Sequence, residues 1–266
     1  MSCLAKSLVI MIGYMLMFAY ADVKFINIVG IEGVGHHAVG PIILSIIQAC
    51  HGNHRSGSYI SPIAMSFESK DVEKTRKIIK ECGPNDVFFS PYSYPAGKSH
   101  RIVNRPNDIK RNYMAYDLEL KFKHLTAAGV DPKHLYLHRN LYEAISSHEH
   151  FDHNFENHTR VMGIYLKHIL QEFNRIDAVK KGLWKRLEYS HLQSATNVKA
   201  VLNAMVQFFG WDPRNCEMKG LIANVMSHIH PPHNRTVDEA KKKWVADNIK
   251  VNMDVIPPLV PSLEHA

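Results

Sequence analysis

Residues 25–40, FINIVGIEGVGHHAVG, constrain the fold most strongly, because they join an apolar run, a glycine loop and the start of a helix. The run 25–29 has the near-continuous hydrophobicity of a strand that is buried on both faces of a parallel sheet. Apolar residues then recur at helical spacing between 39 and 47. The segment therefore predicts a buried strand whose carboxyl end leads through a glycine turn into a helix.

Strands and helices are expected to alternate along the rest of the chain. We expect further strands at 86–90, 134–138 and 183–189, and helices at about 69–81, 114–128, 157–175, 196–209 and 236–250. Residues 51–61 and 91–112 have loop composition, and the tail from 255 onward is expected to be extended. This alternation predicts an α/β fold, a three-layer sandwich with a central parallel sheet, as a single domain over 22–266.

Composition limits the partners of the chain. The 266 residues are 45% hydrophobic, which is enough for a sizeable core, and the formal net charge of +7 favours an anionic ligand. The basic residues are scattered and are not interleaved with aromatic residues that could stack on bases, so we expect no nucleic-acid partner. The 18 histidines raise the chance that metal-like spacings arise by accident.

The amino terminus has the pattern of a targeting segment. Lys6 precedes an uncharged apolar stretch at 7–21, shorter than the ~20 residues that span a bilayer comfortably. We expect a signal peptide over 1–21, with an uncleaved signal anchor, and hence membrane attachment, as the alternative. Glycosylation sequons at Asn157 and Asn234 agree with a secretory-pathway location, either the Golgi lumen or the cell exterior.

The cysteine count allows one disulfide at most. Removing the leader leaves Cys50, Cys82 and Cys216. The sequence does not decide which two of them would pair.

The glycine loop has the spacing of a phosphate-binding turn. Gly30 and Gly35 are separated as in G-x-x-x-x-G, and the backbone N–H groups of such a loop, with the amino end of the next helix, attract anions. A nucleotide-hydrolysing loop would continue with Lys and then Ser or Thr, whereas this one continues with two histidines. The anion site is therefore expected to comprise Gly30, Gly33, Val34, Gly35, His36 and His37.

A second segment, RNLYEAISSHEHF at 139–151, follows another expected strand. Arg139 and Ser147 could together bind a second phosphate, since an arginine fork and a hydroxyl suit that group. Here the chain resembles the sulfotransferases that use 3′-phosphoadenylyl sulfate, whose motif reads R-N-P-x-D-x-x-x-S-Y-Y-x-F or close to it. Leu141 replaces the proline and Glu143 the aspartate. A weaker match to the family's later strand, turn and helix includes Tyr189, His191, Leu192, Phe208, Phe209 and Gly210.

The resemblance implies a P-loop-like sulfotransferase fold and 3′-phosphoadenylyl sulfate as co-substrate, with no metal. Arg139 and Ser147 would hold the donor's 3′-phosphate, and the glycine loop would bind the 5′-phosphosulfate. The acceptor would be a hydroxyl of a carbohydrate or of a protein tyrosine.

The loop departs from the family at its catalytic cation. Gly33 stands where the family has Lys or Arg. His36 or His37 would then act as the cation or as the base, and Glu32 could orient a ring or serve as the base itself. Lys98 or Arg101 could instead reach in from the irregular segment.

Two alternatives stay open. The first is a catalytically degenerate member of the same fold that only binds a nucleotide or another anion. The second is a zinc-dependent hydrolase, because HEHFDH matches the H-x-H-x-D-H metal signature through His148, His150, Asp152 and His153.

Overall fold

The sheet of this α/β protein is entirely parallel. The computed structural model describes residues 23–31, 33–51, 71–81, 86–90, 118–147, 155–228 and 237–263. In these segments four strands pair in the order β2-β1-β3-β4. They are β1 (Lys24–Val29), β2 (Val87–Ser90), β3 (Pro132–His138) and β4 (Trp184–Glu188). The expected α/β class and central parallel sheet are confirmed.

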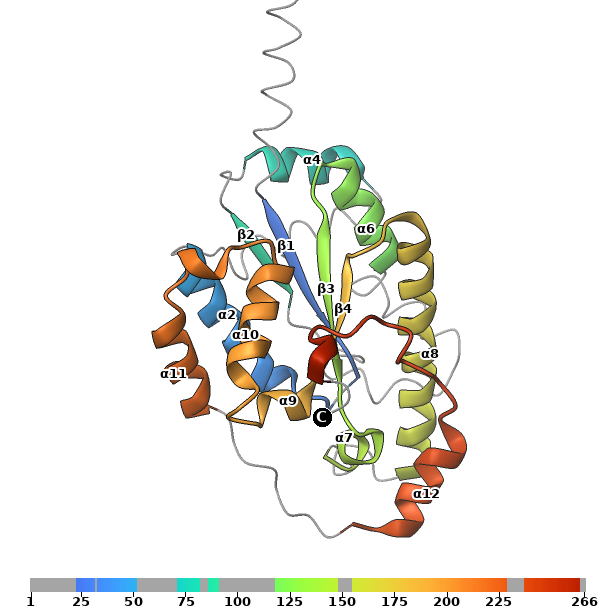
Figure 1. Ribbon diagram of the computed structural model, residues 1–266. Coiled ribbons are helices and arrows are strands. Elements are labelled where there is room, and N and C mark those ends of the chain that lie inside the picture. Colours follow the sequence, from blue (N-terminus) through green and yellow to red (C-terminus); the bar gives the residue numbers. More distant parts are fainter. Residues whose placement is uncertain are drawn as a thin grey trace, which may run out of the picture.

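Helices lie on both faces of the sheet (Figure 1). One face carries α2 (His36–His51), α10 (Val198–Phe208) and α11 (Met218–His228), and the other carries α4 (Val72–Lys80), α6 (Leu118–Ala127) and α8 (Phe155–Val179). Two short helices, α7 (Leu141–Ser147) and α9 (Tyr189–Leu192), follow β3 and β4. The remaining elements are η4 (Pro213–Asn215), α12 (Glu239–Asn248), which packs on α7 and α8, and η5 (Pro261–Leu263).

Burial on both faces explains why β1 lacks an alternating pattern. Five of its six residues are buried. Phe25 packs with Phe88 of β2 and Leu125 of α6 on one face, and the period of two turns its neighbour Ile26 to the other face. Both faces therefore demand apolar side chains, as in other doubly covered parallel sheets.

The strand order places the topological switch point between β1 and β3. These strands are neighbours, with Val29 opposite Tyr136. The chain leaves β1 for α2 on one face of the sheet and leaves β3 for α7 and then α8 on the other side (Figure 1). Diverging connections of this kind are where open α/β sheets bind ligands.

The carboxyl-terminal segment extends the sheet beyond β4. Arg186 donates its N–H to the carbonyl of Pro257 at 2.8 Å and accepts from the N–H of Leu259 at 2.7 Å. The buried Arg186 side chain forms ion pairs with Glu188 and Asp254, each at 2.7 Å. The expected extended tail thus pairs along the outer edge of β4 before η5, where it shields an otherwise open strand edge.

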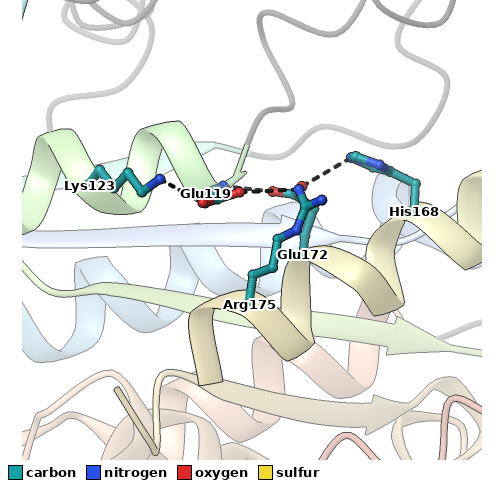
Figure 2. Close-up of polar contacts among 5 residues, drawn as sticks. All are labelled: Glu119, Lys123, His168, Glu172 and Arg175. Atoms are coloured by element: carbon teal, nitrogen blue, oxygen red, sulfur yellow. Dashed lines mark hydrogen bonds and ion pairs between the residues drawn. The ribbon is translucent and has the colours of Figure 1, made fainter. Parts of the chain in front are cut away.

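A buried carboxylate joins α6 to α8 (Figure 2). Glu172 Oε2 of α8 accepts the Glu119 N–H at 2.7 Å, at the first turn of α6, where orphan N–H groups need acceptors. Arg175 Nη1 lies 3.5 Å from Glu172 and 3.2 Å from Glu119. Lys123 pairs with Glu119 at 2.6 Å, and His168 lies 3.7 Å from Glu172. Glu172 and Arg175 thus hold α8 against the first turn of α6 through polar contacts.

A disulfide between Cys50 and Cys216 settles the pairing that the sequence left open. It joins the end of α2 to the segment before α11, where the Glu217 N–H also donates to the carbonyl of Ala49 at 3.1 Å. Cys82 and the expected leader lie outside the described residues. Among the helices that the structure describes, none is long and apolar enough to cross a membrane.

We predict that removing this disulfide destabilises the domain. The bridge spans 166 residues, so it restricts a large part of the unfolded chain. The double variant Cys50→Ser/Cys216→Ser should lose about 2–4 kcal/mol of unfolding free energy in urea titrations. Cys82→Ser is the matched control and should unfold like the wild type. Equal stability of the double variant and the control would contradict this account.

Acid should weaken the ion pairs of Glu119, one with Lys123 within α6 and one with Arg175 of α8. The hydrogen bond from Lys123 lowers the pKa of Glu119 below its ordinary value of 4.5. A carboxylate with a lowered pKa in the folded state stabilises that state fully above the unfolded pKa and loses this effect as pH falls through the folded pKa. Glu119→Gln should therefore lower the melting temperature at pH 7 and flatten its decline as pH falls below the ordinary glutamate pKa of 4.5. If the melting temperatures of the wild type and Glu119→Gln decline in parallel as pH falls, the ion pairs of Glu119 contribute nothing to stability.

Candidate functional site

Two glycines of the loop are required by close approach as well as by backbone conformation. Gly33 and Gly35 have φ values of 86° and 106°, which side chains rarely adopt. A Cβ on Gly33 would lie 2.0 Å from the carbonyl oxygen of Ala144 and 2.6 Å from Ser147 Oγ. On Gly35 it would lie 2.4 Å from the ring of Tyr189. The loop therefore packs directly on α7 and on the residue that follows β4.

The glycine loop leads directly into the amino end of α2. Gly35 accepts the N–H groups of Ala38 at 3.0 Å and Val39 at 2.9 Å, so the helical hydrogen bonds begin at the loop's last glycine. The first turn of α2 contains no acidic residue. The partial positive charge of a helix amino end is thus not neutralised by a carboxylate of its own first turn. Val34, another expected site residue, is buried beneath the turn.

The two adjacent histidines have different environments. His36 is only 8% exposed, and its ring lies 3.2 Å from the point that a Cβ on Gly30 would occupy. His37 is exposed. Of the two expected acid–base candidates, His37 is therefore the one that faces solvent, whereas His36 packs inside the turn. Glu32, the third candidate, lies outside the described residues.

Arg139 contacts the glycine loop from the end of β3. Its Nη1 donates to the Gly33 carbonyl at 3.0 Å, and its Nε donates to Glu143 at 3.2 Å. The guanidinium also lies 5.4 Å from the ring centroid of Tyr189. Nη2 makes no hydrogen bond to any residue that the structure describes, and the side chain is 27% exposed. Arg139 therefore contacts the loop through Nη1, and no residue within the described ranges takes the donors of Nη2, so they can bind a ligand.

Asn140 and Ser147, the other residues of the arginine motif, form hydrogen bonds with the backbone of α7. Asn140 Oδ1 accepts the Glu143 N–H at 3.3 Å, a capping contact at the amino end of this helix. Ser147 Oγ donates to the Ala144 carbonyl at 2.7 Å. The hydroxyl of Ser147 lies beneath Gly33, but its proton is used within the helix. A contact with phosphate would require that hydroxyl to rotate.

The titratable groups in the middle of the sheet have a structural role. His134 of β3 is fully buried, its Nδ1 lies 3.3 Å from Asn27 Nδ2, and its ring stacks on Trp184 at 4.6 Å. Burial lowers the pKa of His134 to about 3, so its ring is neutral at physiological pH. Burial likewise raises the pKa of Tyr136 far above its usual range. Neither group is placed to exchange protons with solvent.

Several sequence-based candidates lie outside the residues that the structure describes. They are Lys98, Arg101 and the zinc-signature residues His148, His150, Asp152 and His153. Within the described ranges no three His, Cys, Asp or Glu side chains gather as a metal site would require. The zinc-dependent hydrolase therefore stays an untested alternative.

Sequence reasoning missed the contact role of Tyr189. The motif match that includes this residue does not predict that its ring contacts both the glycine loop and Arg139. The available signal was its position directly after β4, because the carboxyl ends of parallel strands share one edge of the sheet.

No protein-family model matches the chain, and a search of curated proteins finds no match either. Functional inference therefore depends on the motifs and on the geometry that brings them together. Gly33, Gly35 and Arg139 are the expected site residues that this geometry assembles most directly.

We predict that Gly33→Ala is more damaging than an alanine at a glycine in open space. Gly182 is the matched control, because its φ of 78° is similar but no atom lies within 4 Å of the added Cβ. Gly182→Ala should cost about 1–2 kcal/mol through backbone strain alone. Gly33→Ala should cost more, because the clashing carbonyl belongs to the backbone of α7. Equal unfolding free energies in urea would contradict the close packing of loop and helix.

Proposed function

We propose that this protein binds 3′-phosphoadenylyl sulfate at the glycine loop and transfers its sulfuryl group to a hydroxyl. The acceptor would be a carbohydrate or a protein tyrosine in the secretory pathway, and the fold would be of the P-loop-like sulfotransferase type. The observation that carries the proposal is the hydrogen bond from Arg139 to the Gly33 carbonyl. This hydrogen bond joins the glycine loop to the arginine motif, the two segments that resemble the phosphate-binding motifs of the sulfotransferases.

The chemistry of the assembled site suits a nucleotide with two anionic groups. The loop and the amino end of α2 attract one phosphate or sulfate through backbone dipoles. Arg139 offers the donors of Nη2 to a second one. Glu143, paired with Arg139 at 3.2 Å, is 57% exposed, so it can turn into solvent when an anion binds.

Catalysis needs a charge partner that the loop does not supply through a lysine or an arginine. Sulfuryl transfer spreads negative charge over oxygens, and a nearby cation or oriented donors lower its barrier. His37 is placed for this task, because it is exposed in the first turn of α2. As a neutral ring it would accept the acceptor's proton, and as a cation it would stabilise the leaving phosphate.

A binding-only function is the second candidate. It is favoured by the burial of His36 and by the absence of lysine and arginine from the loop itself. In that case the site would hold the nucleotide without transferring sulfate.

Arg139→Ala should weaken binding of 3′,5′-adenosine bisphosphate, the product nucleotide, by about 10- to 100-fold. A charge-assisted contact to phosphate accounts for about 1.5–3 kcal/mol. Calorimetric titration of the purified chain measures the dissociation constants. Arg214→Ala, which removes a surface arginine with an 89% exposed side chain, is the control and should bind like the wild type. Unchanged affinity in Arg139→Ala would remove the support for this site.

A transfer assay then separates the two functions. Radiolabelled 3′-phosphoadenylyl sulfate is incubated with desulfated glycans and with tyrosine peptides. Label in an acceptor that disappears in His37→Gln supports the enzyme with His37 in the catalytic step. Nucleotide binding without transfer to either acceptor class supports the binding-only function.

A further inference from the structure

Tyr189 lies where three parts of the candidate site meet. It is the first residue of α9, directly after β4, at the same edge of the sheet as the glycine loop and Arg139. Its Cε2 and Cδ2 lie 2.4 and 2.6 Å from the position of a Cβ on Gly35. The ring therefore contacts the loop at the residue where the helical hydrogen bonds of α2 begin.

The same ring lies within cation–π range of the Arg139 guanidinium. The distance from the guanidinium carbon to the ring centroid is 5.4 Å, within the ~6 Å range of cation–π contacts. Two hydrogen bonds, to the Gly33 carbonyl and to Glu143, use the edge of the group. The two hydrogen bonds and the ring contact together restrict the position of the guanidinium.

The aromatic ring of Tyr189 makes both contacts, with the loop at Gly35 and with the guanidinium of Arg139. The Tyr189 hydroxyl forms no hydrogen bond with the residues that the structure describes. Phenylalanine could therefore replace tyrosine here, whereas an aliphatic side chain could not supply the cation–π contact.

We propose that Tyr189 is a positioning residue, which aligns Arg139 with the glycine loop so that Nη2 points to the bound anion. The inference rests on the proposed nucleotide site and adds the residue that pre-organises it. Since the ring acts through Arg139, its effect on the ligand should vanish when Arg139 is absent.

A double-mutant cycle with 3′,5′-adenosine bisphosphate tests this dependence. Tyr189→Phe should bind within about 2-fold of the wild type, and Tyr189→Leu should bind about 5- to 10-fold more weakly. In the Arg139→Ala background, Tyr189→Leu should have no further effect. Additive losses would overturn the proposal, as would a loss in Tyr189→Phe equal to that in Tyr189→Leu, which would instead indicate a ligand contact through the hydroxyl.

A measurement without ligand keeps the inference separate from the proposed function. The Arg139 Nε–H signal in ¹⁵N-resolved NMR, assigned by its loss in Arg139→Ala, should be shifted upfield by the Tyr189 ring current. The shift should persist in Tyr189→Phe and disappear in Tyr189→Leu. A shifted signal in a wild type that binds no nucleotide would refute the proposed function and leave the arrangement of Tyr189 and Arg139 intact. An unshifted wild-type signal would refute the positioning role, whether or not Tyr189→Leu folds.

Discussion

The hydrogen bond from Arg139 to the Gly33 carbonyl is the contact on which the candidate site depends. It joins residues 106 positions apart in the chain, and it is possible only because β1 and β3 are neighbours in a parallel sheet. Parallel pairing brings both carboxyl ends to one edge, where the loop after β1 meets the residue after β3. The close packing of Gly33 on Ala144 then leaves little freedom in how loop and helix α7 can be arranged. The same packing of the loop on α7 thus determines both the conformation of the glycine turn and the position of Arg139.

Much of the fold could be predicted because burial leaves a clear trace in the sequence. Strands covered on both faces read as apolar runs, and all four described strands lie within two residues of their expected bounds. Helix α11 was not anticipated. Its sequence, MKGLIANVMSH, contains glycine, asparagine and serine, which are weak helix formers. Packing on α2, the neighbouring disulfide and the hydrogen bond that the Gly220 N–H donates to Glu217 Oε1 at 3.0 Å compensate for that weakness. Such tertiary contacts have no local signature.

Only those parts of the site that depend on local sequence features could be predicted. Glycine spacing and the arginine after a strand are local features, so Gly33, Gly35 and Arg139 could be named in advance. Orientation is not local. No local pattern indicates that His36 is buried while its neighbour His37 is exposed. The Ser147 hydroxyl bonds to its own helix, and the part played by Tyr189 depends on β4 being the next strand along the sheet.

The most direct test of the central claim is an amide NMR titration of the chain with 3′,5′-adenosine bisphosphate. If the loop and Arg139 form one anion site, saturable shifts should appear together at the amides of 33–37 and at Arg139 Nε–H, with a single dissociation constant. Shifts confined to other surfaces, or no saturable change at the loop, would contradict the account.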